Sequence, residues 1–405
     1  MKILLINHYA GSPELGMEFR PYYMAKEWIK SGNRVLIVGA TFSHLRKTQP
    51  VSGKQNIDGV DYYWVKTNTY KGNGIGRICS MFLFVVKLLF CFRNVCKSFG
   101  PDVVIASSTY PLDIFPARRI AKKYHAKLIF EVHDLWPLSP MEIGGYSKWH
   151  PFIQVIQFAE NYAYKNVDRV VSMLPNAEMH MLEHGLARGK FVYIPNGFNE
   201  EEWTVENKNI VCKYQDLLKQ MKLSGKKIVG YVGGHAKSNA LDILIDAMKL
   251  VNNPDIVCVL VGKGHEKERL MCRVAEEGIK NVMFLDPVHK NEIPALLLCM
   301  DVLYIGGANN PLYRFGISPN KLIDYMLSGK PILHAINAAN DWVTEYDCGV
   351  SVPAESHEKI AEKIEYLVSQ DELMLKEKGK NGEEFVRQNL SYSILAGKFI
   401  NAVKG

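Results

Sequence analysis

The segment 318–326 carries the most specific chemical pattern in the chain. Ser318 is typical of a helix N-cap, and Pro319 suits the first position of the helix that follows. Lys321 then lies in the first helical turn, where the helix dipole disfavours a cation. An anion held there by free backbone N–H groups and the ammonium together would explain the lysine. Asp324 shares its face and can accept hydrogen bonds from sugar hydroxyls. The alternative is an ordinary surface lysine on a capped helix.

Further cations lie in two nearby predicted loops. Arg314 stands just upstream of the segment described above. Gly234 and Lys237 follow the predicted strand 228–232, where glycine lets the backbone approach a phosphate and lysine adds charge. On its own this loop is a weak signal, because many strand-to-helix loops contain glycine. The chain has no Gly-x-Gly-x-x-Gly after the first strand and no Walker loop, which argues against a dehydrogenase or an NTPase.

The first half of the chain offers a different set of groups. His133 and Asp134 directly follow the predicted strand 127–131. His133 can donate to a substrate oxygen or move a proton, and Asp134 can orient it or accept from a hydroxyl. A loop His-Asp pair is often only a structural hydrogen bond. Gly16 and Glu18 lie in the loop after the first strand, which fits a structural turn and an active-site loop equally well.

We identify no metal-binding motif in the sequence. The sequence has no Asp-x-Asp, and we identify no His, Cys and Asp cluster with metal-ligand spacing. A bound diphosphate would then be held by Lys, Arg and helix termini without a divalent ion. The eight cysteines form no Cys-x-x-Cys pair, which fits buried free thiols in a reducing, cytoplasmic compartment.

The hydrophobic pattern predicts the α/β elements that would position these groups. Continuous Val, Ile and Leu runs indicate parallel strands that are buried on both faces and wrapped by helices. The strand–helix pattern lapses at 199–209 and then restarts. The predicted strands cover residues 2–6, 34–39, 102–106, 127–131, 169–173 and 191–194, and then 228–232, 256–261, 282–285, 302–305 and 331–334.

This pattern predicts two facing Rossmann-like domains, at 1–200 and 201–385. Ligands of such open sheets bind at the carboxyl ends of the strands, so we expect one cleft between the domains. A last helix, at 386–405, has no strand after it and is expected to pack back across the domain junction.

Charge is unevenly distributed along the chain, whose formal net charge is +7. Residues 1–200 carry 24 Lys and Arg against 15 Asp and Glu, whereas residues 201–405 carry 25 against 27. The excess indicates an anionic partner of the first half. No nucleic-acid recognition motif is present, so an anionic membrane surface or a phosphorylated acceptor is favoured. The apolar run 78–92 is too short to span a bilayer and is either a core helix or an interfacial one at the inner face of the cytoplasmic membrane.

In this order, the pieces resemble the group 1 (family 4) retaining glycosyltransferases of GT-B fold. More narrowly, they resemble the bacterial branch that builds O-antigen and capsule repeat units on a lipid carrier. The resemblance covers nearly the whole chain and includes Ile-Pro-Asn-Gly at 194–197. It implies that Asp324 replaces the family's second glutamate, which binds the donor ribose, and that His133 lies near the transferred sugar. The donor-binding residues that it implies are Gly16, Gly234, Lys237, Arg314, Ser318, Asn320, Lys321 and Asp324.

Two positions depart from the family pattern. The first glutamate of the family, eight positions before Asp324, falls on Gly316. The usual Arg and Lys of the first loop of the second domain fall on Gly234 and Asn239, with Lys237 nearby. The phosphate contacts of that loop are therefore less well specified by the sequence.

The resemblance implies a metal-independent, retaining hexosyltransferase with His133, Asp134 and Glu18 as catalytic residues. It would move an N-acetylated amino or deoxyamino sugar from a UDP-sugar donor to a lipid-linked saccharide acceptor. Two other functions stay open. The first is a nucleotide-sugar epimerase or phosphorylase on the same fold. The second is a non-catalytic donor-binding partner of another transferase, because Gly316 replaces an acid.

Overall fold

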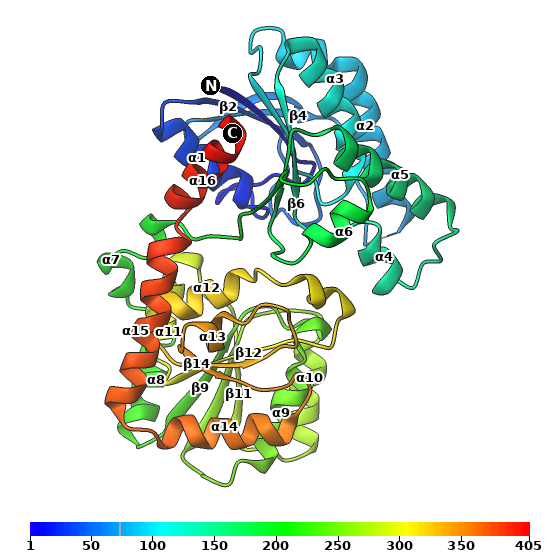
Figure 1. Ribbon diagram of the computed structural model, residues 1–405. Coiled ribbons are helices and arrows are strands. Elements are labelled where there is room, and N and C mark those ends of the chain that lie inside the picture. Colours follow the sequence, from blue (N-terminus) through cyan, green and yellow to red (C-terminus); the bar gives the residue numbers. More distant parts are fainter. Residues whose placement is uncertain (73) are drawn as a thin grey trace. The chain divides into compact units, whose positions relative to one another are not determined.

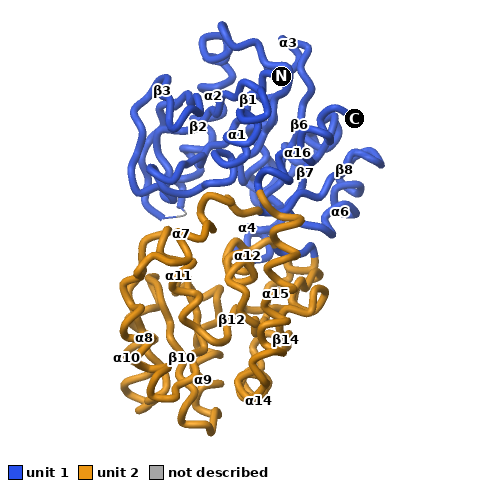
Figure 2. The backbone as a smooth tube through the Cα atoms, turned by 90° about the vertical axis from the view of Figure 1, so that its left-hand side faces the viewer, with its two compact units in different colours: residues 1–196, 315–317, 392–405 blue, residues 197–314, 318–391 orange. Residues whose placement is uncertain are grey.

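The computed structural model describes residues 1–72 and 74–405, and the chain forms two compact units. Unit 1 comprises residues 1–196, 315–317 and 392–405, and unit 2 comprises residues 197–314 and 318–391 (Figure 2). The chain passes from the first unit to the second at residues 196 and 197, four residues before the expected position. The expected cleft between the two units stays a prediction.

Unit 1 is built on a sheet of eight strands in the order β3-β4-β2-β1-β5-β6-β7-β8 (Figure 1). All neighbouring strands are parallel except β3 and β4. The strands are β1 Lys2–Ile6, β2 Arg34–Ala40, β3 Gly53–Ile57, β4 Val60–Val65, β5 Val103–Ala106, β6 Lys127–Val132, β7 Arg169–Ser172 and β8 Phe191–Tyr193. The helices are α1 Arg20–Lys30, α2 Ile75–Cys96, α3 Ile114–Tyr124, α4 Leu138–Glu142, α5 Pro151–Asn166, α6 Glu178–Glu183 and α16 Tyr392–Lys404.

Alternate residues of β1 enter two different apolar cores, as expected for a strand that is buried on both faces. Leu4 and Ile6 pack with side chains of α2, α3 and α5, whereas Ile3 and Leu5 pack with those of α1 and α16. Because helices cover both faces of the sheet, polar groups can gather only where the strands end.

The hairpin of β3 and β4 is missing from the predicted strands. Its turn consists of Asp58 and Gly59, whose φ angles of 50° and 84° are those of a type I′ turn. Asp-Gly between two strand-prone runs is an established hairpin signal, which would have identified this element.

Unit 2 has a parallel sheet of six strands in the order β11-β10-β9-β12-β13-β14. The strands are β9 Lys227–Val232, β10 Ile256–Val261, β11 Val282–Leu285, β12 Val302–Gly306, β13 Ile332–Ala335 and β14 Gly349–Ser351, of which β14 was not predicted. The helices are α7 Val205–Lys208, α8 Gln215–Leu223, α9 Leu241–Leu250, α10 Lys267–Glu276, α11 Ile293–Leu298, α12 Asn320–Leu327, α13 Trp342–Glu345, α14 His357–Ser369 and α15 Glu372–Asn389. The expected fold class, two parallel-sheet α/β domains, is confirmed.

Each sheet reverses its strand order at one point, between β1 and β5 in unit 1 and between β9 and β12 in unit 2. Ligands of open α/β sheets bind outside the carboxyl ends of the strands at such a switch point. In unit 1 the adjoining loops hold Gly16, Glu18 and His133, and in unit 2 they hold Gly234 and Arg314. The topology therefore concentrates the predicted residues at two strand-end sites, one in each unit.

The last helix expected at 386–405 is α16, which begins only at residue 392 because the helical structure is interrupted at residues 390 and 391. Helix α15 belongs to unit 2, whereas α16 belongs to unit 1 and packs on α1. The indole N–H of Trp28 donates to the Ala396 carbonyl at 3.3 Å, and its ring lies 5.1 Å from that of Phe399. Buried aromatic contacts thus hold the chain end to the first unit.

The apolar run expected at 78–92 is part of a longer helix, the 22-residue α2. Within the described part of the chain, α2 alone is long and apolar enough to cross a membrane by length and composition. One of its faces, which includes Phe84 and Leu88, is buried in the core of unit 1. Its other face exposes Phe82 and Phe90 at 37% and 75%. The helix is therefore both a core element and an apolar surface.

Candidate functional site

Helix α12 presents the lysine of the most specific sequence pattern at its amino end. The helix begins at Asn320, and its N-cap is Pro319, not Ser318 as expected. Pro319 has extended backbone angles of −77° and 123°, and a residue before proline disfavours helical geometry, so Ser318 lies outside the helix. Lys321 nonetheless occupies the first turn, as predicted.

Lys321 is held by neutral partners. Its Nζ donates to the Tyr231 hydroxyl at 2.8 Å and to Oδ1 of Asn239 at 3.0 Å, and it lies 4.2 Å from the centroid of the Tyr231 ring. Among the residues that the structure describes, no carboxylate is paired with Lys321. Burial lowers the pKa of Lys321 to about 7. A half-buried ammonium at a helix amino end, without a counter-charge, is an arrangement that an anion would complete.

The loop after β9 packs directly against this lysine. A Cβ at Gly233 would lie 2.7 Å from Cε of Lys321, so a side chain there would push the ammonium aside. Asn239, at the position of the family's lysine, accepts from Lys321 and so positions the remaining cation. Gly234 and Lys237 are exposed at the surface of the loop, where both remain accessible to a ligand.

Asp324 lies one turn further along α12 and is half-buried. Its Oδ1 accepts from the indole N–H of Trp203 at 3.3 Å. Burial raises the pKa of Asp324 to about 7, with Lys290 acting against the shift and Glu202 adding to it. Trp203 was not predicted as a site residue, since its position in the polar stretch after unit 1 gave no periodic signal.

The remaining predicted donor residues are solvent-facing or structural. Asn320 is exposed at the helix start, and the exposed Arg314 donates through Nη1 to the Pro311 carbonyl at 2.6 Å. Gly316 is buried with a φ of 96°, a backbone conformation that strains any residue with a side chain. The local backbone therefore explains why a glycine replaces the family's first glutamate here.

In unit 1, a buried ion pair forms the base of the second site. Nε of Arg20 lies 3.0 Å from Oε1 of Glu131, and the two side chains are 4% and 2% exposed. Arg20 also donates through Nη2 to the Ile194 carbonyl at 3.1 Å. Burial alone would raise the pKa of Glu131, but Arg20, His133 and Ser107 hold it well below its usual range. Glu131 is thus a permanent carboxylate under the strand ends.

The imidazole of His133 lies next to the carboxylate of Glu131. Its Nε2 lies 2.9 Å from the Ser107 hydroxyl and 3.4 Å from Oε2 of Glu131, and its Nδ1 lies 3.7 Å from Oε2 of Glu18. Although burial opposes it, the carboxylates of Glu18 and Glu131 raise the pKa of His133. The histidine can therefore carry a proton at neutral pH.

Gly16 and Glu18 belong to a tight loop that follows β1. The N–H of Gly16 donates to the Ser12 carbonyl at 2.8 Å. A Cβ at Gly16 would lie 2.9 Å from the backbone nitrogen of Lys47. Its φ of 108° also requires glycine. Oε2 of Glu18 is buried, makes no hydrogen bond among the described residues, and lies 3.7 Å from Nδ1 of His133.

Asp134 does not orient His133 as expected. Its Oδ1 accepts from the Leu135 N–H at 2.9 Å and from the Ser139 hydroxyl at 2.6 Å, and its Oδ2 accepts from the Trp136 indole at 3.2 Å. These bonds anchor the loop that leads into α4. The groups that orient His133 are Glu131 and Ser107, neither of which was predicted, and Ser107 follows a different strand, β5.

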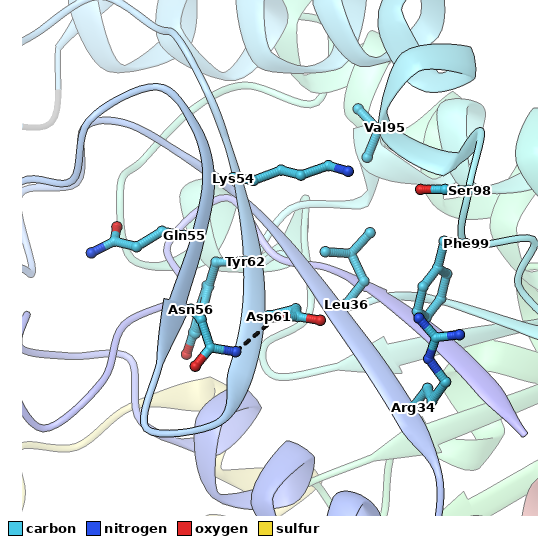
Figure 3. A pocket seen from close by; sticks show the side chains of 10 residues that line it. All are labelled: Arg34, Leu36, Lys54, Gln55, Asn56, Asp61, Tyr62, Val95, Ser98 and Phe99. Atoms are coloured by element: carbon cyan, nitrogen blue, oxygen red, sulfur yellow. Dashed lines mark hydrogen bonds between the residues drawn. The ribbon is translucent and has the colours of Figure 1, made fainter.

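A cavity of about 310 Å³ lies elsewhere on unit 1 (Figure 3). Arg34 and Asp61, which line it, stand at the amino ends of β2 and β4, opposite the strand ends that hold His133. It contains none of the predicted site residues.

Comparison with known proteins agrees with this architecture. Residues 16–197 match the glycosyl transferase 4-like domain, and residues 215–385 match glycosyl transferases group 1. The chain is 23% identical over 301 residues to WcaI of Escherichia coli K12, described as a colanic acid biosynthesis glycosyl transferase, over 71% of this chain and 70% of WcaI.

Two solved structures have the same fold. Sucrose-phosphate synthase from Thermosynechococcus elongatus superposes with a TM-score of 0.76 at 17% identity, over 99% of this chain and 98% of that one. Anabaena HepE in complex with UDP and glucose gives a TM-score of 0.69 at 17% identity, over 100% and 99% of the two chains. The two family models follow one another along most of the chain, which is therefore a group 1 glycosyltransferase with the GT-B fold.

Proposed function

We propose that the chain transfers a sugar from a UDP-sugar to a lipid-linked saccharide acceptor, with retention of configuration and without a metal ion. The product belongs to a cell-surface polysaccharide of the O-antigen or capsule type, and the sugar is an N-acetylated amino or deoxyamino sugar. The observation that carries the proposal is the half-buried Lys321, whose ammonium has no carboxylate partner among the described residues. The complexes of HepE with UDP and the colanic acid assignment of WcaI support the donor and product classes.

The donor diphosphate binds at the amino end of α12. Lys321 and the backbone N–H groups there bind its oxygens, and the exposed Lys237 and Arg314 add cations from the neighbouring loops. Asp324 accepts from the ribose hydroxyls. These contacts stabilise the charge that develops on the leaving diphosphate. Each well-placed group lowers the activation free energy by about 3–4 kcal/mol.

In unit 1, His133 and Glu18 at the strand ends contact the transferred sugar. His133 donates to an oxygen of the transferred sugar, and Oε2 of Glu18, which makes no hydrogen bond among the described residues, accepts from a hydroxyl. The acceptor hydroxyl then attacks from the face that the diphosphate leaves, and a phosphate oxygen takes its proton. The C–O bond to the diphosphate breaks as the bond to the acceptor forms, so the step needs no redox partner.

The acceptor carrier lies in an anionic membrane, which unit 1 contacts through α2. The exposed apolar stripe of α2 consists of Ile75, Cys79, Phe82, Val86 and Phe90, spaced three or four residues apart. The neighbouring α3 exposes Arg119, Lys122 and Lys123, and Arg119 lies 5.3 Å from the ring of Phe92 on α2. Apolar side chains bordered by cations suit the interface of an anionic bilayer. These features support a peripheral position of the protein at the inner face of the cytoplasmic membrane.

The first prediction tests the reaction itself. Purified protein with a panel of nucleotide sugars and a lipid-linked saccharide acceptor should release UDP in excess EDTA. The reason is that Lys321 and its neighbours, and not a metal ion, neutralise the charge of the diphosphate. The anomeric configuration of the product, read by NMR, should match that of the donor. A requirement for magnesium or manganese, or an inverted product, would contradict the mechanism. Release of an epimerised donor without acceptor would favour an epimerase.

The second prediction concerns Lys321→Met, which should weaken UDP binding by about 2–4 kcal/mol in calorimetric titration. The same change should stabilise the free protein by about 1–2 kcal/mol at pH 7, because it removes a desolvated cation. Since the folded-state pKa of Lys321 is about 7 and its ordinary value is 10.5, the gain should be full below pH 7, decline between pH 7 and pH 10.5, and vanish at higher pH.

Lys398→Met is the matched control, because Lys398 is exposed on α16. It should change neither UDP affinity nor stability. If Lys321→Met binds UDP as tightly as the wild type, α12 is a scaffold and the donor site is wrong.

The third prediction separates the two sites. His133→Ala should lower turnover about 100-fold, since it removes a proton donor beside the sugar, while the affinity for free UDP stays unchanged. Asp134→Asn should instead lower the melting temperature through the loop into α4. A loss of UDP affinity in His133→Ala at unchanged turnover would reverse our assignment of the two sites.

The fourth prediction addresses the membrane. Replacing Phe82, Val86 and Phe90 by serine should release the protein from anionic vesicles in flotation assays without lowering UDP affinity, because these side chains lie outside the core. Leu223 and Leu373, which are 79% and 78% exposed in unit 2, provide the serine control. If the wild-type protein does not bind anionic vesicles at low salt, the exposed stripe of α2 is not a membrane-binding surface.

A further inference from the structure

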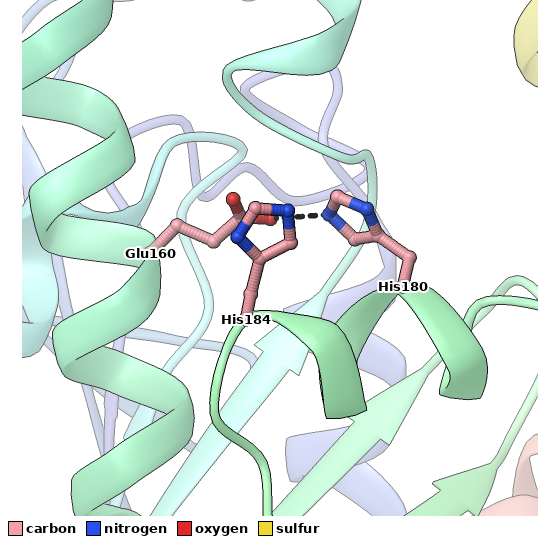
Figure 4. A group of neighbouring side chains, drawn as sticks. All are labelled: Glu160, His180 and His184. Atoms are coloured by element: carbon pink, nitrogen blue, oxygen red, sulfur yellow. Dashed lines mark hydrogen bonds and ion pairs between the residues drawn. The ribbon is translucent and has the colours of Figure 1, made fainter.

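Three side chains of unit 1 that belong to neither functional cluster converge between α5 and α6. Glu160 comes from α5, His180 from α6, and His184 from the residue that caps α6 (Figure 4). Nε2 of His180 lies 3.0 Å from Oε1 of Glu160, and one ligand atom of each residue lies within 4.8 Å of the other two. The rings of the two histidines are 4.3 Å apart.

The charge of Glu160 makes this cluster unusual. The residue is 1% exposed, and among the described residues no lysine or arginine is paired with it. Its surroundings are part of the apolar core, which includes Ile156 and Ala163 on the same helix. A carboxylate buried in such surroundings is costly unless a positive charge lies close by. A divalent cation bound between Glu160 and the two imidazoles would supply that charge.

The carboxylate is also held in place by neutral donors. The Tyr164 hydroxyl donates to Oε1 at 3.1 Å, and Nε2 of Gln157 donates to Oε2 at 2.7 Å. Hydrogen bonds of this kind fix the orientation of ligands around metal sites. Oδ1 of Asn161, 3.0 Å from Nδ1 of His184, adds a further oxygen at the half-buried side of the cluster.

We propose that Glu160, His180 and His184 bind one Zn²⁺ ion. Two imidazoles and one carboxylate are a zinc ligand set, and histidines four residues apart meet on one side of a helical turn. Zinc lies about 2.0–2.2 Å from such ligands, so two of them stand roughly 3.4 Å apart around a tetrahedral ion. The observed separations need only small side-chain rotations, and the half-buried His184 leaves the fourth position to water.

This site corrects the expectation that the chain holds no metal-ligand spacing. His180 and His184 carried that spacing in the sequence, but Glu160 stands 20 residues earlier on another helix. The ion would be structural, because it joins α5 to α6 and shares no residue with the donor or sugar sites. His180 also lies 5.6 Å from the ring of Phe315, so the ion would stiffen the surroundings of the segment 315–317 of unit 1.

The test measures zinc itself, so that its outcome is independent of the transferase proposal. Chelator-treated full-length protein, incubated with zinc and desalted, should retain one zinc per chain by elemental analysis. The cobalt-substituted protein should show the visible absorption of tetrahedral Co²⁺. His184→Ala removes a half-buried ligand without opening the core, and it should weaken zinc binding at least tenfold in competition with a fluorescent chelator.

His265→Ala is the matched control, because this histidine is exposed and lies in unit 2. It should retain zinc like the wild type. Glu160→Gln should weaken zinc binding too, and circular dichroism shows whether that variant is folded. If the wild type retains no zinc, or His184→Ala retains as much as the wild type, the cluster is a hydrogen-bonded network and the proposal is wrong.

Discussion

Burial of both faces of each sheet is the constraint that positions the two strand-end sites of this protein. Ile3 and Leu5 enter one core while Leu4 and Ile6 enter another, so no polar side chain can project from the middle of β1. Chemistry is confined to the ends of the strands, where the chain leaves the sheet. At the switch points of the two sheets, adjacent loops diverge and leave room for ligands.

The two strand-end sites differ in whether their buried charge is paired with an opposite charge. In unit 1, Glu131 is matched by Arg20 and His133, so its carboxylate is a fixed, compensated part of the scaffold. In unit 2, Lys321 is desolvated and held by the neutral groups of Tyr231 and Asn239. The first arrangement fixes the orientation of His133, the proton donor of the proposed function. The second leaves a free-energy deficit that an anionic ligand would relieve, so the proposed donor binding would raise the stability of unit 2.

Helix α2 shows how one element can serve two environments. Phe84 and Leu88 are fully buried in unit 1, whereas Phe82 and Phe90, only two residues away in each case, are exposed. A helix that is apolar all round carries no periodic signal to distinguish these faces. The packing of α3 and the strands decides which face is covered, and the exposed face remains available for a surface of similar polarity.

The residue pattern alone predicts most strands of the parallel sheets, though not β14, because continuous Val, Ile and Leu runs have few other ways to be buried. It also placed Lys321 at a helix start through the local signal of a proline and a capped turn. It missed the β3–β4 hairpin despite its Asp58-Gly59 turn, and it misplaced the N-cap at Ser318. Tertiary structure alone decided the partners. Ser107 meets His133 only because β5 and β6 are neighbours, and Trp203 reaches Asp324 from 121 residues away. Periodicity reports which residues are buried, but not which distant residues are buried together.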